Sequence, residues 1–340
     1  MRAPDLRLAE AQKVASALTG VPVTIERVAR AGRNSLIYHV QCDVGEFALK
    51  NYPSRADDPR DRLGTEISAL QLMERGGIDT VPRVTGVDRE RHFVLMSWIR
   101  GTAVTEVTES DIDAAFDFLA KVHALRSAPT ANEQPLAAEA CLSGSEIERQ
   151  ITVRLERLLR IADEGELHLF LKESFIPAFE RERTTAKLKM QSADPGFDSE
   201  LPSERRSLAA SDFGFHNSLR RPNGSLAFFD FEYFGWDDPV KLTADFMLHP
   251  GVALSATQRL RIRRSAELLY RDDIGFAQRL GAYLQLFGLR WVLILLNEFI
   301  PDRWRRRVSA GASEGWVETK AMQLAYAVDF LASLRDKVEG

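Results

Sequence analysis

The spacing of apolar and polar residues divides the chain into an N-terminal part with strands and a longer, mostly helical part. Over residues 23–29, 36–42 and 46–52, apolar residues alternate with polar ones or form short runs with β-branched and aromatic residues, which predicts three strands. Residues 1–19 have the pattern of an amphipathic helix that ends near Gly20. The chain is therefore expected to begin with a helix and a small antiparallel sheet.

One helix and a further strand complete this first part. After the third strand, apolar side chains recur on one helical face up to the C-cap signal Gly76-Gly77, and the apolar run at residues 93–99 predicts a buried strand that leads to Gly101. The core-facing candidates on the helix are Ile67, Leu70, Leu72 and Met73.

After Gly101 the pattern is mostly helical, apart from strands around residues 211–232. Helices are predicted over residues 111–125, 145–161, 167–190, 281–299 and 317–334, and a capping box opens another at residues 255–258. Residues 191–204 are polar and contain two prolines, which predicts a loop. The tripeptide at residues 222–224 (Pro-Asn-Gly) predicts a tight turn between two apolar runs.

Composition narrows the class of protein. The chain has 340 residues, of which 45% are hydrophobic and 28% charged, so it can bury a full core. A net charge of −4 gives no basic footprint for nucleic acid, and two cysteines cannot form a disulfide framework. There is no signal-peptide pattern, and the longest apolar run, residues 291–296, is too short to span a membrane. We therefore expect a cytoplasmic protein without membrane or nucleic-acid partners, and the oligomeric state is left open.

Three polar residues around the predicted turn have the spacing of a catalytic site. Asn217 follows Asp212 by five residues, and the turn folds Asp230 back toward both of them. Carboxylate and carboxamide oxygens suit a hard cation such as Mg²⁺, which takes one or two carboxylates together with substrate phosphates. A leading Asp that is left free of metal can accept a proton from a substrate hydroxyl.

These residues resemble the motif of the aminoglycoside phosphotransferase and choline kinase family of small-molecule kinases. That family has an Asp, an Asn five positions later and a second Asp at the end of the next strand. The run Gly-Trp-Asp-Asp-Pro at residues 235–239, with Asp245 beyond it, is also similar to the family. The resemblance extends over residues 23–299 and implies an α+β, bilobal protein-kinase-like fold. It implies a nucleotide-binding lobe at residues 1–98 and a helical catalytic lobe at residues 99–340.

The resemblance also implies a nucleotide site in the first lobe. Lys50 at the end of the third strand and Glu66 on the following helix match the ion pair that holds ATP phosphates in kinases. The turn at residues 30–35 can lay backbone N–H groups and Ser35 over phosphates, although an ordinary hairpin turn has the same pattern. The hinge between lobes would place adenine against Ser97, Trp98 and Ile99.

We therefore predict an ATP- and Mg²⁺-dependent kinase that phosphorylates a hydroxyl group of a small molecule. Asp212 is the expected base, Asn217 and Asp230 are the expected Mg²⁺ ligands, and Lys50 binds the phosphates. The family's His-Gly before the catalytic Asp is replaced here by Ala210-Ser211, so the bonds that orient Asp212 must come from elsewhere. The alternative is a nucleotide-binding pseudokinase without transfer activity; the missing His-Gly argues mildly for it, whereas the complete set of Lys50, Glu66, Asp212, Asn217 and Asp230 argues against it.

The acceptor is predicted only by class. The segments at residues 212–217 and 230–234 are similar to family members of bacterial surface-polysaccharide pathways, which implies a sugar-like or amino-alcohol acceptor. On the helix at residues 281–299 one stripe carries polar groups among apolar ones; it either lines the acceptor pocket or forms a buried network. The candidate acceptor contacts are Glu232, Trp236, Arg290, Asn297 and Glu298.

The spacing of the histidines does not predict a second metal site. The chain has six, and no two have the spacing of a zinc-binding helix, so each is expected to be a surface residue or a hydrogen-bonded core residue. His216, inside the catalytic segment, is the one expected neighbour of the active site.

Overall fold

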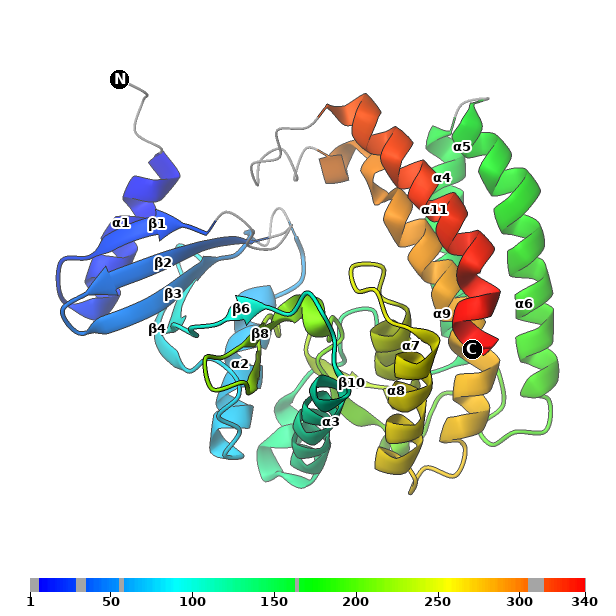
Figure 1. Ribbon diagram of the computed structural model, residues 1–340, viewed down its shortest axis with the longest axis horizontal. Helices are drawn as coiled ribbons and strands as arrows, with labels where there is room; N and C mark the ends of the chain where they lie inside the picture. Colours follow the sequence, from blue (N-terminus) through cyan, green and yellow to red (C-terminus); the bar gives the residue numbers. More distant parts are fainter. Residues whose placement is uncertain (1–5, 29–34, 55–57, 163–164, 305–314, 340) are drawn as a thin grey trace.

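A computed structural model describes residues 6–28, 35–54, 58–162, 165–304 and 315–339 of the chain. The N-terminal part is a five-stranded antiparallel sheet in the order β1-β2-β3-β5-β4, with a helix on each face (Figure 1). Its strands are β1 (Thr24–Arg27), β2 (Leu36–Cys42), β3 (Gly45–Asn51), β4 (Val84–Asp88) and β5 (Phe93–Ser97), and its helices are α1 (Leu6–Thr19) and α2 (Arg62–Arg75). The strands and both helices that the sequence predicts here are confirmed.

The continuous apolar run of β5 results from burial on both faces of the sheet. Phe93 and Leu95 pack in a core with α1, whereas Val94 and Met96 face α2. The core beneath α2 is continuous with the core of the helical part, so the two parts share apolar packing.

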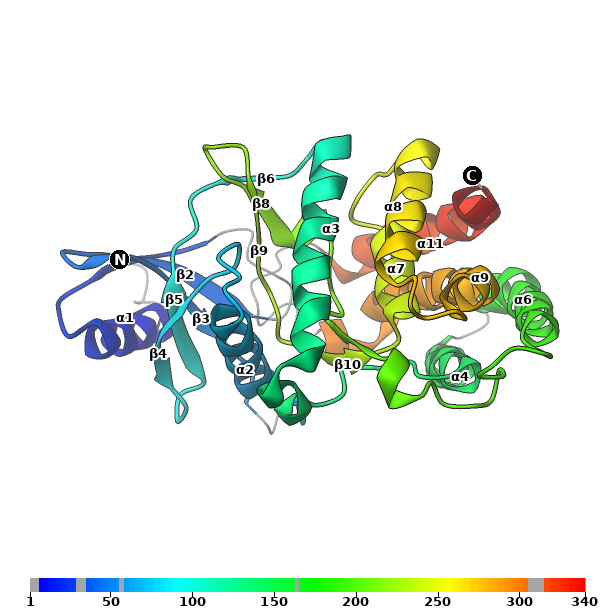
Figure 2. The same cartoon turned by 90° about the horizontal axis from the view of Figure 1, so that it is seen from below.

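The helical part is built around α9 (Phe276–Leu295), which contacts α4, α6, α7 and α11. In Figure 1, α11 runs alongside α9, while Figure 2 shows α3 beside α8. The α-helices of this part are α3 (Glu109–Ala124), α4 (Gly144–Ile161), α5 (Glu166–Leu169), α6 (Ile176–Lys189), α7 (Pro239–Leu248), α8 (Ala256–Leu269), α9 and α11 (Trp316–Glu339). The predicted capping box opens α8, where Ser255 and Gln258 cap each other's backbone.

One predicted helix differs in its interior. The sequence predicts a single helix over residues 167–190, whereas the structure has α5, a π-helical turn η3 (Phe170–Phe175) and then α6. The π-helical turn ends just before Pro177, whose missing N–H cannot continue the regular hydrogen-bond ladder, so the change back to the α-helical register falls next to it.

Two small sheets carry the segments around the catalytic motif. β6 (Thr102–Ala103), β8 (Ser218–Arg220) and β9 (Leu226–Phe228) form one antiparallel sheet, and β7 (Ser207–Ala209) pairs with β10 (Gly235–Asp237). The turn predicted at residues 222–224 joins β8 to β9, and Gly224 has a φ of 86°, which favours glycine. Short 3-10 turns lie at Leu125–Ser127, Pro129–Glu133, Ser203–Arg205, Phe215–Asn217 (η5) and Leu296–Phe299 (η6).

The segment Phe276–Phe299 is long and apolar enough to cross a membrane by length and composition, and 72% of its most apolar window is buried inside the protein. The segment is buried because α9 lies at the centre of the helical part, in contact with α4, α6, α7 and α11.

The packing of α9 against α11 gives the first testable prediction. A Cβ atom at Gly288 would lie 2.2 Å from Leu334 Cδ1, whereas at Gly281 on the same helix the nearest atom would be 3.9 Å away. Gly288→Ala should therefore cost about 1–3 kcal/mol through overpacking. Gly281→Ala should instead gain about 0.5–1 kcal/mol from helix propensity. Chemical denaturation of both variants measures the difference; equal stabilities would contradict close packing at Gly288.

Candidate active site

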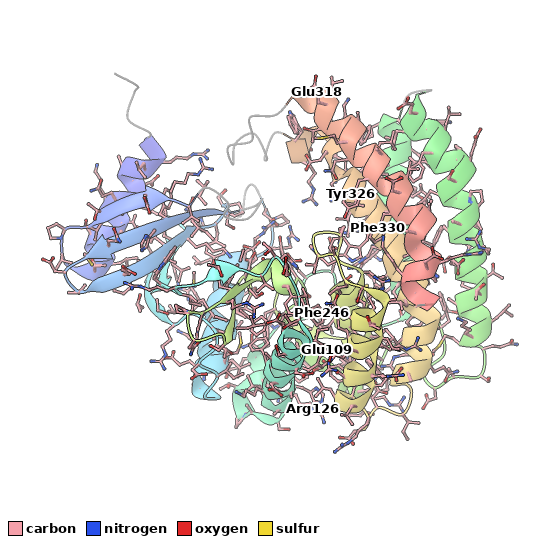
Figure 3. All side chains as sticks on the ribbon, in the orientation of Figure 1. Glu109, Arg126, Phe246, Glu318, Tyr326 and Phe330 are labelled. Carbon is pink, nitrogen blue, oxygen red and sulfur yellow. The ribbon has the colours of Figure 1, made fainter. Side chains whose placement is uncertain are left out.

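The catalytic segment leaves β7 through a strained residue and is fixed by buried aromatic rings. Ser211, directly before Asp212, has a φ of 48°, in the left-handed region that non-glycine residues rarely adopt. Phe213 and Phe215 are buried and both pack against Phe246 of α7 (Figure 3). Because alternate residues of the segment are held in the core, Asp212 and His216 remain only partly buried.

The hairpin β8–β9 brings Asn217 next to Asp230. The N–H of Phe229 donates to the carbonyl of Asn217 at 3.1 Å. This hydrogen bond joins the segment before β8 to the segment after β9, one residue before Asp230. The Asn217 side-chain N–H₂ donates to the Asp212 carbonyl at 2.9 Å, so its side-chain oxygen is the atom left to accept or to bind a cation. All three motif residues therefore lie around one point.

Lys50 reaches this point from the sheet. Its ammonium lies 2.7 Å from Glu66 Oε2, 2.6 Å from Asp230 Oδ1 and 3.3 Å from Glu232 Oε2, and the residue is only 3% exposed. Glu66 is fixed in turn by the hydroxyl of Tyr52 and by the N–H of Phe231, which donates at 3.1 Å. The predicted pairing of Lys50 with Glu66 is present, and Tyr52 is a supporting residue that the sequence did not indicate.

Three carboxylates around one ammonium leave an excess of negative charge. Burial raises the pKa of Asp230 to about 7, and the charges of Glu232 and Glu66 act in the same direction, against the opposing effect of Lys50. Burial lowers the pKa of Lys50, but Asp230 and Glu66 together hold it well above its usual range. Lys50 therefore stays charged, while Asp230 is the group that would gain most from a cation.

This donor set fits the implied Mg²⁺. The Asp230 side chain is 24% exposed, unlike Lys50 at 4%, so Asp230 is the group of this cluster that solvent or a ligand can reach. The carboxylates of Glu66, Asp230 and Glu232 approach one another closely enough to hold an ion, but the Lys50 ammonium lies among them. Asp230 together with the Asn217 oxygen is therefore the pair that suits a hard cation.

Glu232 has a structural position. Both of its oxygens are engaged: Oε1 accepts from Arg62 at 2.7 Å, and Oε2 accepts from the Ser35 hydroxyl at 3.1 Å. It is 4% exposed, so it ties the loop before β2 and the start of α2 to the segment after Asp230. The candidate phosphate-binding turn at residues 30–34 lies outside the described residues; Ser35 lies at its described end.

The candidate adenine residues lie at the end of β5, where Ser97 is its last residue, and directly after it. The Trp98 N–H donates to the Glu46 carbonyl at 3.3 Å, and its indole ring stacks on His39 at 4.0 Å. The Ser97 hydroxyl accepts from the Arg83 N–H at 3.0 Å. Trp98 and Ile99 are half-buried in the connection to β6, between the sheet and the helical part.

Two histidine side chains lie near the Asp212 carboxylate. His216 Nε2 lies 3.2 Å and His249 Nε2 3.9 Å from Asp212 Oδ1. Burial raises the pKa of the Asp212 carboxyl, but the hydrogen bond and charge of His216, with smaller effects of His249 and Lys241, lower it to about 2. Asp212 is therefore ionised at neutral pH. From the sequence, His249 was expected to be a surface residue or a hydrogen-bonded core residue. It lies far from the motif along the chain, so no local pattern indicated that it would be near Asp212.

The polar stripe of α9 is largely buried. Arg290 is 3% exposed and donates to both oxygens of Asp245 at 2.9 and 2.8 Å and to Gln150 at 3.2 Å. Of the two alternatives for the stripe, Arg290 therefore belongs to a buried network and does not line a pocket. Glu298 is also buried, and Asn297 is half-buried in η6. Trp236, half-buried in β10, donates its indole N–H to the Ala131 carbonyl at 3.1 Å. Of the stripe, Asn297 is the residue with partial exposure and no network partner among the described residues.

Lys241 of α7 is a further residue that the sequence did not indicate. Its ammonium lies 3.1 Å from Asp237, 3.7 Å from Asp245 and 3.3 Å from the Ser211 hydroxyl, so it joins the segment before Asp212 to the buried carboxylates of the helical part.

The opposite pKa shifts of the two motif carboxylates predict opposite stability effects. The pKa of Asp230 is raised in the folded protein, so its ionisation costs stability as the pH rises from about 4 to about 7. The pKa of Asp212 is lowered, so its ionisation adds stability that is lost as the pH falls toward about 2. At pH 8, Asp230→Asn should therefore melt above the wild type and Asp212→Asn below it. The gain of Asp230→Asn should shrink toward pH 4, and a gain that is constant with pH would contradict the raised pKa.

Comparison with solved structures identifies the fold. A choline kinase of Streptococcus pneumoniae superposes with a TM-score of 0.59 at 18% identity, covering 97% of this chain and 100% of that one. An ethanolamine kinase of Plasmodium vivax gives 0.57 at 12%, covering 93% and 84%. A spectinomycin phosphotransferase with bound ADP and spectinomycin gives 0.57 at 11%, covering 93% and 98%. The predicted α+β, bilobal kinase-like fold is thus confirmed.

The family is shown by the sequence itself. No curated protein matches the chain significantly. The model of the phosphotransferase enzyme family matches residues 24–267, which is more than half of the chain and contains Lys50, Asp212 and Asp230. The protein therefore belongs to the phosphotransferase enzyme family, as its motif predicted.

Proposed function

We propose that this phosphotransferase transfers the γ-phosphoryl group of ATP to a hydroxyl group of a small molecule. The observation that most supports this is the convergence of the Lys50–Glu66 pair, Asp230, Asn217 and Asp212 on one point from β3, α2 and the two ends of the β8–β9 hairpin. A module that only binds a nucleotide has no use for an ionised carboxylate beside the cation ligands.

On the phosphate side, Lys50 binds the phosphate oxygens, and Glu66 keeps its ammonium in place. Asp230 and the Asn217 oxygen hold Mg²⁺, which neutralises charge on the phosphates when it is bound. Binding of the nucleotide and its cation gives new partners to the ammonium and to the Asp230 carboxylate, whose pKa is raised by burial and, to a smaller extent, by the neighbouring carboxylates Glu232 and Glu66.

On the acceptor side, Asp212 accepts a hydrogen bond from the substrate hydroxyl and then its proton. Both imidazoles approach Oδ1; among the described residues, Oδ2 makes no hydrogen bond. The low pKa of Asp212 keeps the carboxylate ionised over the physiological range. The base contributes about 10²–10⁴-fold in such reactions, and the rest of the acceleration comes from positioning and charge.

The acceptor that we propose is a sugar-like or amino-alcohol molecule. Structural neighbours include a choline kinase, an ethanolamine kinase and a phosphotransferase with bound spectinomycin. The carboxylates behind Asp212 are each paired with a buried cation: Asp237 with Lys241, Asp238 with Arg279 and Asp245 with Arg290. Because their charge is neutralised, they do not attract a polycation, which favours an acceptor with many hydroxyls and little charge.

Asp212→Asn and Asp230→Ala separate the two halves of the proposal. Asp212→Asn should abolish transfer while Mg·ATP still raises the melting temperature, because Asp212 contacts the acceptor. Asp230→Ala should lose both transfer and the Mg·ATP-dependent rise. Thermal shift with and without Mg·ATP, beside an ADP-release assay, gives both readouts. If Asp212→Asn lost nucleotide binding as completely as Asp230→Ala, the assigned roles would be wrong.

An ATP-consumption screen over amino sugars, neutral sugars, nucleosides and amino alcohols tests the reaction itself. We expect ADP release with a hydroxyl-rich acceptor of low charge. Measurable Mg·ATP binding with no turnover on any member of the panel would instead support the pseudokinase alternative.

Asn297 and Arg290 should differ in what their loss affects. Asn297→Ala should raise the KM for the acceptor, or lower kcat/KM, about tenfold, or about 1.4 kcal/mol, with the KM for ATP and the melting temperature near wild type. Arg290→Leu leaves the buried Asp245 without its main partner and should cost about 3–5 kcal/mol of stability. Acceptor kinetics and denaturation of both variants check this. An unstable Asn297→Ala with normal kinetics would show that Asn297 is structural.

A further inference from the structure

Asp212 lacks the histidine that precedes the catalytic Asp in related kinases, and two other histidines surround it. His216 lies on the same 3-10 turn as Asn217, and His249 directly follows α7. Their rings stack with centroids 3.7 Å apart and an interplanar angle of 4°. The role assigned to them below rests on the proposed function of Asp212.

The hydrogen bonds fix which nitrogen of each ring carries a proton. The N–H of Gly251 donates to Nδ1 of His249 at 3.1 Å, so this nitrogen is an acceptor and the proton of the neutral ring is on Nε2. The Asp212 carboxylate only accepts, so His216 Nε2, 3.2 Å from Oδ1, donates as well. Both rings therefore present an Nε2–H group to the same carboxylate oxygen.

Two glycines make the space for this pair. A Cβ atom at Gly214 would lie 2.8 Å from His216 Nδ1, and one at Gly251 would lie 2.9 Å from His249 Cε1. Neither glycine has a φ that requires glycine, so close approach of an imidazole is what the absence of a side chain provides.

The pair is held from behind by α9. Trp291 meets His249 edge-on at 4.8 Å, and its indole N–H donates to Asp245 Oδ1 at 2.9 Å. Asp245 is held in turn by both N–H groups of Arg290 Nη2. The loop after His249 is tied to α11 by the Tyr326 hydroxyl, which donates to the Pro250 carbonyl (Figure 3). The buried Arg290 thus acts on the site through Asp245 and Trp291.

A metal ion does not suit this arrangement, although Asp212, His216 and His249 are close enough to hold one. An imidazole nitrogen directs its lone pair in the ring plane, and two stacked rings with centroids 3.7 Å apart and an interplanar angle of 4° lie in different, nearly parallel planes, so one ion cannot lie in both. The Gly251 bond also leaves Nε2 of His249 with the proton.

We propose that His216 and His249 are positioning residues that hold Asp212 Oδ1, so that Oδ2 faces the acceptor hydroxyl. They take the place of the histidine that precedes the catalytic Asp in related kinases. His216 holds the carboxylate by a hydrogen bond. His249 fixes the ring of His216 by stacking and adds a second N–H near the same oxygen.

Histidine NMR tests the geometry without any need for turnover. In protein labelled with ¹³C,¹⁵N-histidine at pH 8, His216→Gln and His249→Gln assign the two signals. We expect both rings as Nε2–H tautomers, and Asp212→Asn should shift both signals while the signal of His168 on α5 stays in place. An Nδ1–H tautomer at either ring, or signals that do not respond to Asp212→Asn, would overturn the proposal.

Kinetics test the effect on the reaction, with the acceptor that the screen identifies. His216→Phe keeps an aromatic ring and removes the donor; kcat should fall about a hundredfold, with the KM for ATP near wild type. His216→Gln, which returns an N–H at the same distance from the backbone, should recover most of the rate. His249→Phe keeps an aromatic ring stacked on His216, so it should lower kcat less than His249→Ala does. His168→Phe is the matched control, and its kcat should equal that of the wild type.

Gly214→Ala provides an independent variant, because it displaces the His216 ring without changing it and should lower kcat in the same way. The proposal is wrong if His216→Gln is as slow as His216→Phe, or if His216→Phe changes the melting temperature and not kcat. If the wild type turns over no acceptor, the proposed function fails, and the tautomers and the response to Asp212→Asn still decide whether the pair holds Asp212.

Discussion

One buried ammonium contacts carboxylates from both parts of this protein. Lys50 of β3 contacts Glu66 of α2 and Asp230 and Glu232 after the β8–β9 hairpin, so the sheet, the helix and the helical part all meet at one charge. Removing an ammonium from water costs several kcal/mol, which only close, hydrogen-bonded carboxylates offset. The relative position of the two parts is therefore set where the nucleotide phosphates are proposed to bind.

The charges on either side of the site are balanced differently. Behind Asp212, the buried carboxylates Asp237, Asp238 and Asp245 have Lys241, Arg279 and Arg290 as partners, and this network serves as a rigid support. Around Lys50, carboxylates outnumber the ammonium; burial raises the pKa of Asp230, and the neighbouring carboxylates Glu232 and Glu66 raise it further. Proteins keep such destabilised groups where a ligand relieves them. We therefore propose that the cation and the phosphates bind on the unbalanced side and that the acceptor binds on the balanced side.

The sequence predicted what depends on local spacing and periodicity. Strands β1, β2, β3 and β5, helices α1 and α2, the α8 capping box and the hairpin turn follow from patterns within a few residues, whereas β4 was not predicted. Asp212, Asn217 and Asp230 follow from one short motif. Contacts between distant segments were out of reach. Helical periodicity placed Arg290 and Asn297 on one stripe, but only the fold decides that Arg290 faces the buried Asp245. In the same way, nothing near Glu232 in the sequence shows that Ser35 and Arg62 will take both of its oxygens.

The replacement of His-Gly by Ala-Ser before Asp212 also has a physical counterpart in the fold. The two imidazoles beside Asp212 instead come from positions after it in the chain: His216 lies on η5, and His249 directly follows α7. The support therefore passes through Trp291 and Asp245 to α9, which also carries Arg290 and leads into η6 with Asn297. The base, through His249 and Trp291, and this candidate acceptor contact are therefore both attached to one helix and its extension. Orientation of the base is in this way coupled to the helix that borders the proposed acceptor site.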